Sequence, residues 1–379
     1  MEYRQFGKLN FKVSALGFGC MRLPTTGKPE DINEPAAIQM IRYAIDAGVN
    51  YIDTAYPYHG GNSEKLLAKA LTDGYRQKVA IATKMPVWMV QQSQDFDRLF
   101  HEQLERLQTQ HIDFYLLHNL QAHSWAQMRQ LNALGWLEKA RDRGHIGHIG
   151  FSFHDNFAVF KEIIDAYDGW EFCQIQYNYV NENVQAGTQG LQYAADKGLA
   201  VIIMEPLFGG ALASPPPLVQ QLWRHAPAHA DPVTTALRWL WNKPQVATVL
   251  SGMSTLEQVQ HNLAAATGSG IGTISQAESD LITQAQEKYK QLNPIPCTQC
   301  GYCTPCPHGL AIPSNFSLYN NAHVFAGNTV ALSRALYGLL PPSHRAESCT
   351  DCGDCEPKCP QQIPIRQWMP RVHKELSVK

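Results

Sequence analysis

The sequence has no apolar run long enough to cross a membrane. A transmembrane helix needs about 20 consecutive apolar residues, whereas the run from Leu199 to Met204 already stops at Glu205. The N-terminal segment 1–7 also lacks the apolar stretch of a signal peptide. We therefore expect a cytoplasmic protein without a membrane anchor.

The sequence also has no excess of charge of one sign. Its 31 Lys and Arg residues against 33 Asp and Glu give a formal net charge of −2. This balance provides neither the basic stripe that binds nucleic acid nor a polybasic patch for anionic lipids. We expect no nucleic-acid or membrane partner, and a chain of 379 residues is long enough for one large core and a smaller module.

Cysteine is scarce in most of the chain. Residues 1–296 contain two cysteines, Cys20 and Cys173, whereas the other eight of the ten lie between residues 297 and 359. Without a secretory signal, such crowding indicates metal binding rather than disulfides. Because a proline-marked junction at 293–296 precedes the crowded segment, we expect two domains, 1–292 and 293–379.

Segments with strand and helix patterns alternate through the first domain. The expected strands are 15–19, 51–55, 79–84, 112–118, 147–153, 172–178, 199–205 and 246–251. The expected helices are 34–47, 63–72 with Ser63 as N-cap, 95–108, 128–143, 155–167 opened by Asp155, 188–197, 232–242 and 254–265, with extra helices near 276–291 and 327–339. Eight strands alternating with eight helices predict an α/β fold, a (β/α)8 TIM barrel. A hairpin over residues 2–14 is expected to close its bottom.

Polar residues stand where three consecutive strands end. Asp53 is followed five residues later by Tyr58, and Lys84 and His118 end the next two strands. The C-terminal ends of barrel strands meet at one mouth, so these four side chains are expected to converge. Each alone also fits a structural role in a turn, a core or a solvated surface. Together, an acid, a phenol, an ammonium and an imidazole suit proton delivery to a carbonyl oxygen.

Several motifs resemble those of the aldo-keto reductases, in the family's order and over roughly residues 1–290. The matching motifs are Ile52–Ala55 with Tyr58, Ala80–Lys84, Leu116–His118, Ile149–Ser152, Gln174–Asn178 and Leu250–Ser254 with Asn262. The resemblance implies a nicotinamide dinucleotide lying across the barrel mouth and hydride transfer between it and a carbonyl carbon. It makes Tyr58 the general acid, with a pKa lowered by Lys84 from the usual value near 10. Asp53 would orient Lys84, and His118 would position the carbonyl oxygen.

The same resemblance implies the cofactor contacts. Ser152 and Gln174 match positions that hold the carboxamide, with His154 as a candidate replacement for the asparagine that often follows Ser152 in the family. The last strand–helix turn matches the adenosine-phosphate segment, with Ser251, Gly252, Ser254, Gln258 and Asn262 as contacts. No Lys or Arg occurs between residues 251 and 263, and a 2′-phosphate favours arginine. The expected cofactor is therefore NADP or NAD.

For the substrate, aromatic and histidine side chains in loops after strands are candidates, although loop packing explains them equally well. These residues are Trp88, His123, Trp125 and Phe208.

The two cysteine runs have the spacing of iron–sulfur ligands. The run 349–359 reproduces the ferredoxin pattern C-x2-C-x2-C-x3-C-P, and the run 297–306 is one residue shorter before its last cysteine. In two-cluster ferredoxins the fourth cysteine of a run serves the other cluster. This predicts two 4Fe-4S clusters, one on Cys297, Cys300, Cys303 and Cys359, and the other on Cys349, Cys352, Cys355 and Cys306. The alternative is two zinc sites, although zinc ribbons place paired C-x2-C knuckles far apart. Several bacterial aldo-keto reductase relatives are similar to the whole arrangement, a barrel with a ferredoxin-like tail.

Two functions follow from these features. The first is an enzyme, an NAD(P)(H)-dependent carbonyl reductase or alcohol dehydrogenase for a small molecule, whose clusters are structural, transfer electrons or sense redox state. The alternative is an iron–sulfur electron-transfer or redox-sensing protein whose barrel mainly binds a nucleotide or a partner. A redox partner protein is possible in both cases. Clusters pass single electrons and nicotinamide passes hydride, and we find no flavin motif that would join the two.

Overall fold

A computed structural model describes the chain except for residues 227–229, 298, 300, 326–327, 360 and 378–379. The chain divides into two compact units. Unit 1 contains Met1–Pro206 and Ala236–Ile274, and unit 2 contains Leu207–Thr235 and Ser275–Lys379. These units group residues by contact, so the domain boundary expected after residue 292 stays a prediction.

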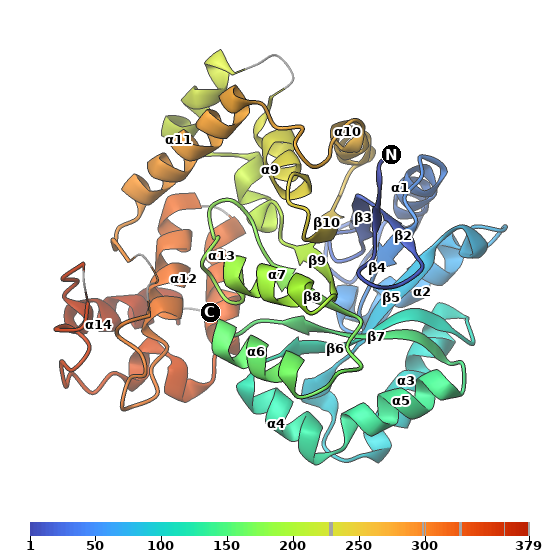
Figure 1. Cartoon of the computed structure of the whole chain (residues 1–379), viewed down its shortest axis with the longest axis horizontal. Coiled ribbons are helices and arrows are strands. Elements are labelled where there is room, and N and C mark those ends of the chain that lie inside the picture. Colours follow the sequence, from blue (N-terminus) through green and yellow to red (C-terminus); the bar gives the residue numbers. More distant parts are fainter. Residues whose placement is uncertain (227–229, 298, 300, 326–327, 360, 378–379) are drawn as a thin grey trace. The chain divides into compact units, whose positions relative to one another are not determined.

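Unit 1 is built on a closed barrel of eight parallel strands, in the order β10-β3-β4-β5-β6-β7-β8-β9 (Figure 1). The strands are β3 (Leu16–Gly19), β4 (Tyr51–Asp53), β5 (Ala80–Met85), β6 (Ile112–Leu120), β7 (Ile146–Phe153), β8 (Phe172–Gln176), β9 (Ala200–Met204) and β10 (Val246–Gly252). Most are almost continuously apolar because a parallel sheet is covered on both faces. The predicted TIM barrel is confirmed.

Helices follow the strands and lie around the barrel (Figure 1). They are α1 (Glu34–Asp46), α2 (Asn62–Ala70), α3 (Gln94–Leu107), α4 (Ala122–Gln130), α5 (Ala133–Asp142), α6 (Phe157–Asp165), α7 (Gly187–Asp196) and α10 (Leu256–Ala266). Helix α9 (Pro232–Trp241) spans the division between the units.

Three details of the expected helices are wrong. The segment 128–143 forms two helices rather than one, because Asn132 between them has a left-handed backbone (φ 58°). The N-cap of α2 is Gly61 rather than Ser63, which is buried in the first turn. The N-cap of α6 is Asn156, whose side chain accepts from two backbone N–H groups, whereas Asp155 accepts from the backbone of Ala122.

The expected hairpin is present and closes the N-terminal end of the barrel. Its strands, β1 (Tyr3–Gln5) and β2 (Lys12–Ser14), pair antiparallel. Phe6 is fully buried in a cluster of residues from the beginnings of the strands, with its ring centroid 4.8 Å from that of Phe114 and 5.7 Å from that of Phe172. The opposite end, where the strands finish, is the mouth.

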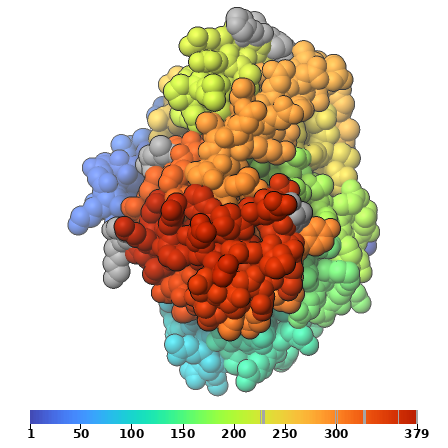
Figure 2. Space-filling view, turned by 90° about the vertical axis from the view of Figure 1, so that its left-hand side faces the viewer, coloured from blue at the N-terminus to red at the C-terminus, as the bar shows by residue number. Residues whose placement is uncertain are grey.

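Unit 2 is mainly helical in its described part. Its helices are α8 (Pro217–Gln220), α11 (Gln276–Leu292), α12 (Ile312–Phe325), α13 (Asn328–Leu339) and α14 (Ile365–Leu376). Phe316, Met369 and Val372 belong to its core, and cysteines of both runs pack against that core. Helices α12 and α14 were not anticipated from the sequence. Figure 2 shows, in red, the face that the C-terminal segment of this unit forms. Among the described helices, none has the length and apolar character needed to span a membrane.

Candidate functional site

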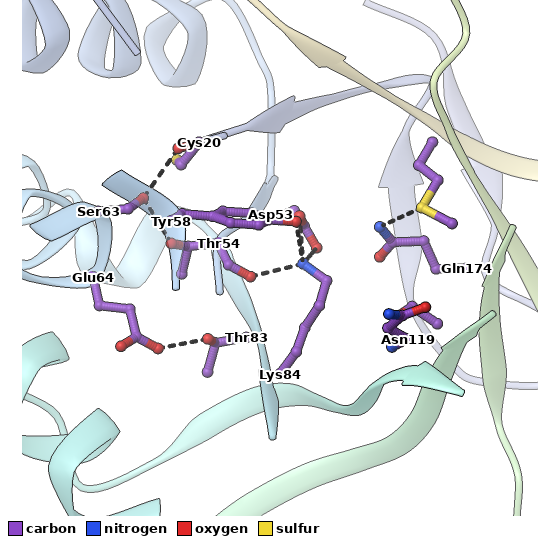
Figure 3. A network of polar contacts seen from close by, with 12 residues as sticks. Cys20, Asp53, Thr54, Tyr58, Ser63, Glu64, Thr83, Lys84, Asn119 and Gln174 are labelled. Carbon is purple, nitrogen blue, oxygen red and sulfur yellow. Dashed lines mark hydrogen bonds and ion pairs between the residues drawn. The ribbon is translucent and has the colours of Figure 1, made fainter. Parts of the chain in front are cut away.

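The centre of the barrel mouth is an ion pair between Lys84 and Asp53 (Figure 3). Lys84 is fully buried, and its Nζ donates to the two carboxylate oxygens of Asp53 at 2.7 and 2.8 Å and to the carbonyl of Thr54 at 2.7 Å. Asp53 ends β4 and Lys84 lies on β5; these strands are neighbours, and their register pairs Asp53 with Ala82. Lys84 is therefore two residues further along β5, with its side chain on the same face as Ala82.

Tyr58 and His118 complete the group. The hydroxyl of Tyr58 lies 3.5 Å from Nζ of Lys84, and the ammonium is 5.0 Å from the centroid of the ring. The ring of His118 stands edge-on to that of Tyr58, with 6.1 Å between centroids. The structure thus brings together all four residues expected at the mouth, Asp53, Tyr58, Lys84 and His118, while their roles stay predictions.

Burial decides the protonation of this group. Burial raises the pKa of Tyr58 from its usual value near 10, and the nearby Lys84 offsets this only in part, so the expectation of a lowered pKa is wrong. Burial lowers the pKa of Lys84, but the charges of Asp53 and Tyr58 and its hydrogen bonds outweigh it and raise the pKa overall. Burial, with Lys84 and His154 nearby, holds the pKa of His118 well below 6.5. The site therefore combines a neutral phenol, an ammonium and a neutral imidazole.

A layer of buried polar side chains supports Lys84 from helices α2 and α3. The hydroxyl groups of Thr54 and Ser63 are 2.8 Å apart, and Thr83 donates to Glu64 at 2.7 Å (Figure 3). Gln103 donates to the carbonyl of Lys84 at 3.1 Å and to Glu64 at 2.8 Å.

This supporting layer was not anticipated from the sequence. One signal was available, because Gln103 follows Leu99 by four residues and stands beside Leu104, both buried on α3. It is therefore a polar residue in the apolar stripe of an amphipathic helix.

Two expected cofactor residues face each other across neighbouring strands. The β7–β8 register pairs Ser152 with Gln174. Ser152 accepts a hydrogen bond from the backbone N–H of Asn119 at 2.7 Å. The amide nitrogen of Gln174 contacts the sulfur of Met204 at 3.6 Å, while its Oε1 is buried without a hydrogen-bond partner in the described part of the chain. A buried acceptor without a partner can accept a hydrogen bond from the amide N–H of a carboxamide such as that of nicotinamide.

The remaining expected cofactor residues form the turn from β10 into α10. Asn262 donates to Ser251 at 2.9 Å, and Gln258 accepts from the backbone N–H of Ser254 at 2.8 Å. The turn leads into a helix of 11 residues, and a helix N-terminus attracts anions.

Arg22 packs against this turn. It was not anticipated, because it precedes the turn by more than 200 residues in the sequence. Its carbonyl accepts from the hydroxyl of Ser254 at 2.7 Å. A Cβ at Gly252 would lie 2.7 Å from Cγ of Arg22, so the glycine permits this approach.

Among the aromatic candidates, Trp88 lies at the site and Trp125 does not. The ring of Trp88 is 5.1 Å from that of His118, and half of the residue is exposed. Trp125 is buried and packs near Trp170.

The described cysteines of unit 2 line two hollows. The first hollow is lined by Cys303 and by all four cysteines of one expected set, Cys306, Cys349, Cys352 and Cys355. The second hollow is lined by three cysteines of the other set, Cys297, Cys303 and Cys359. The fourth member, Cys300, lies outside the described residues. In the part of the chain that is described, no group of three or more Cys, His, Asp or Glu side chains is arranged to hold a single metal ion.

Comparison with known proteins identifies both parts of the chain. Residues 15–284 match the model of the aldo/keto reductase family, and residues 296–363 match a 4Fe-4S dicluster domain. The chain belongs to the aldo/keto reductase family. Among similar proteins, L-galactose dehydrogenase of Arabidopsis thaliana is 29% identical over 308 residues, which cover 74% of this chain and 94% of that protein. The probable aldo-keto reductase 1 of Glycine max is 34% identical over 157 residues, 39% of this chain and 44% of that protein.

Solved aldo-keto reductases share the fold. The holo form of aldo-keto reductase AKR11C1 from Bacillus halodurans aligns with a TM-score of 0.63 and 25% identity, over 75% of this chain and 96% of that protein. The protein is thus an aldo/keto reductase with a C-terminal ferredoxin-like 4Fe-4S domain, and it belongs to a family of oxidoreductases.

Proposed function

We propose that the barrel is an NAD(P)(H)-dependent oxidoreductase that interconverts a small carbonyl compound and its alcohol. The observation that carries the proposal is the fully buried ammonium of Lys84, bonded to both oxygens of Asp53 and 3.5 Å from the hydroxyl of Tyr58. When bound, nicotinamide dinucleotide donates or accepts hydride at C4 of its ring. In reduction, Tyr58 gives its hydroxyl proton to the carbonyl oxygen, and in oxidation its phenolate takes the proton back.

The electrostatics support this role for Tyr58. Because burial raises the pKa of Tyr58, the phenol holds its proton near neutral pH and can act as an acid. Once the proton has left, the ammonium of Lys84 stabilises the phenolate. The neutral imidazole of His118, close to Tyr58, can donate a hydrogen bond to the same carbonyl oxygen.

The cofactor is proposed to lie across the mouth. Gln174, with its unpartnered acceptor, and Ser152 hold the carboxamide. Ser251, Gly252, Ser254, Gln258 and Asn262 hold the adenosine phosphate end. NADP and NAD are both candidates, since this segment lacks Lys and Arg while Arg22 lies against it. A preference for NADPH over NADH that disappears in Arg22→Gln would identify the arginine as the partner of the 2′-phosphate.

In unit 2 we propose two 4Fe-4S clusters, which pass one electron at a time. One would be held by Cys306, Cys349, Cys352 and Cys355, and the other by Cys297, Cys300, Cys303 and Cys359. The support is that all four cysteines of one set line one hollow and the three described cysteines of the other line the second. The same two hollows also support the second candidate function. In that case the protein transfers electrons or senses redox state, and its barrel mainly binds a nucleotide or a partner.

The decisive experiment is turnover of a panel of aldehydes and ketones with NADPH and NADH. Tyr58→Phe is expected to lower kcat/KM by about 10²–10⁴-fold, the usual contribution of a general acid. Tyr43→Phe makes the same chemical change at an exposed position and should match the wild type. Undiminished turnover in Tyr58→Phe rejects the assigned role, and no turnover of any carbonyl by the wild type favours the second candidate.

A further inference from the structure

The two hollows of unit 2 differ in the charges that line them. Lys358, Arg366 and His308 line the first hollow, together with the single carboxylate of Asp354. The second hollow has amide and apolar lining residues such as Gln361 and Phe316, and its described lining contains no Lys, Arg, His, Asp or Glu. The two cysteine-lined hollows therefore have similar ligand chemistry but different electrostatic surroundings.

Arg366 is held in place by Glu356. It belongs to the first turn of α14, where its backbone N–H donates to Oε1 of Glu356 at 3.0 Å and its Nε to Oε2 at 3.1 Å. Asp351 is 3.8 Å from the same Nε. Neither of these two carboxylates is among the residues that line the first hollow. The two terminal nitrogens of Arg366 make no hydrogen bond to a described residue, so their donors are available.

The guanidinium of Arg366 lies against the backbone of the loop 352–355, which carries two of the expected cysteine ligands. A Cβ at Gly353, between Cys352 and Cys355, would be 3.3 Å from Nε and 3.4 Å from Cζ of Arg366. Gly353 also has a φ of +82°, which favours glycine. The absence of a side chain there lets the cation approach the loop closely. This loop and α14 belong to the segment that forms the red face of unit 2 in Figure 2.

The charges and the solvation of the lining residues both affect the reduction potential of a cluster bound in each hollow. An iron–sulfur cluster with four thiolate ligands is an anion, and reduction adds one more negative charge. Cations and N–H donors stabilise the reduced form more than the oxidised form, which raises the reduction potential. Apolar surroundings without charge disfavour the added electron. The lining of the first hollow therefore favours reduction more than that of the second, while Glu356 and Asp351 beside Arg366 offset part of its charge.

We propose that Arg366, anchored by Glu356 and assisted by Lys358, raises the reduction potential of the cluster in the first hollow above that of the cluster in the second. In half-reduced protein the electron then resides in the first hollow. One electron from the reductant enters the iron atoms there, and no bond is made or broken. This inference rests on the two-cluster part of the proposed function.

The experiment is a potentiometric titration of the full-length, anaerobically prepared holoprotein with dithionite, followed by EPR of the reduced clusters. The wild type should show two separate one-electron waves. Arg366→Gln should move the higher wave to more negative potential and leave the lower wave in place, because its hollow lacks the arginine. Lys358→Gln should move the same wave in the same direction.

The matched control is Arg371→Gln. It removes the same charge from the same helix, but Arg371 lies over the ring of Trp368 and lines neither hollow. Both waves should stay at their wild-type positions. Arg366→Lys, which keeps the charge and loses the planar fork, should shift the higher wave less than Arg366→Gln does.

The iron and acid-labile sulfide content of each variant distinguishes a failure of the proposed function from a failure of this inference. Fewer than two clusters in the wild type contradicts the proposed function. Two intact clusters whose waves both move in Arg366→Gln, or of which only the lower moves or neither moves, overturn the inference. If Arg366→Gln does not bind iron, Lys358→Gln decides alone, because Lys358 is exposed and has no hydrogen bond or ion pair to a described residue.

Discussion

At the scale of single residues, the buried pair of Lys84 and Asp53 is a costly arrangement. Taking two charges out of water costs several kcal/mol per ion, and well-packed apolar residues in the same place are often as stable or more so. The three short hydrogen bonds of the ammonium offset this cost. We infer that the pair is present for the chemistry of Tyr58 rather than for stability.

This view predicts different outcomes for single and double substitution. Lys84→Met leaves Asp53 buried without its partner and should lower the free energy of unfolding by about 3–5 kcal/mol and abolish turnover. Lys84→Met combined with Asp53→Leu should regain most of the stability but none of the turnover. Urea denaturation and carbonyl reduction measure the two effects.

The exposed pair of Lys78 and Asp46 is the control for this prediction. Both side chains are about half exposed, so Lys78→Met should change stability by about 1 kcal/mol at most. A comparably small effect of Lys84→Met would show that the buried pair is not under electrostatic stress.

Buried histidines should make the barrel sensitive to acid. Burial lowers the pKa of His154 to about 4 and holds that of His118 well below 6.5. Below pH 6.5 the unfolded chain binds protons that the folded chain does not, so stability is lost as the pH falls from about 6.5 toward 4, by at most about 1.4 kcal/mol per unit for each histidine. Above pH 7 these groups add no pH dependence.

Unfolding free energies between pH 4.5 and 7.5 test this behaviour. His154→Gln should reduce the slope below pH 6.5, whereas His101→Gln, at an exposed position, should leave it as in the wild type. An identical slope in His154→Gln and wild type would contradict the assignment.

At the scale of secondary-structure elements, α2 and α3 keep the lysine strand in place. Gln103 of α3 contacts the carbonyl of Lys84 and Glu64 of α2, and its Oε1 accepts from Tyr115 of β6 at 2.6 Å. One side chain thus connects two helices and two strands. Each buried polar group that loses its partner costs about 1–3 kcal/mol.

Gln103→Leu should therefore destabilise the barrel by about 3–5 kcal/mol, because several partners are left unpaired at once. At temperatures where the variant is folded, it should lower kcat more than it raises KM, since the position of Lys84 rather than substrate binding changes. Gln94→Leu, exposed at the start of the same helix, is the control. Equal stability of Gln103→Leu and wild type would show that the network is dispensable.

The elements also show what the sequence could and could not predict. The barrel strands were recognisable because burial on both faces leaves apolar runs that end in polar residues, as at Lys84. Helix α12 was missed because it is buried on most sides, so its sequence has no amphipathic period. Asn315 and Asn320, poor helix formers, sit inside it and bond to the backbone of other segments. Tertiary contacts of that kind leave no local pattern.

At the scale of the whole molecule, the same limit applies to contacts between distant segments. The cysteine spacing predicted which cysteines would lie near one another, since each expected set is mostly encoded within one run, and the described members of each set line one hollow. The approach of Arg22 to Gly252, and of Arg366 to Gly353, depends on how separate segments pack. Both glycines were visible in the sequence, but the arginines packed beside them were not.

The division of labour between the units gives the last prediction. Asp53, Tyr58, Lys84 and His118 all belong to unit 1, and the eight cysteines of the two runs all belong to unit 2. Cys349→Ser should therefore reduce the iron content by about half while kcat/KM for carbonyl reduction with NAD(P)H stays within about twofold, because no ligand takes part in hydride or proton transfer. Tyr58→Phe should do the reverse and leave the EPR signals of the clusters unchanged. Parallel loss of hydride transfer and cluster content in Cys349→Ser would mean that the clusters take part in carbonyl reduction, and the barrel would then need a route from single electrons to hydride that its described residues do not reveal.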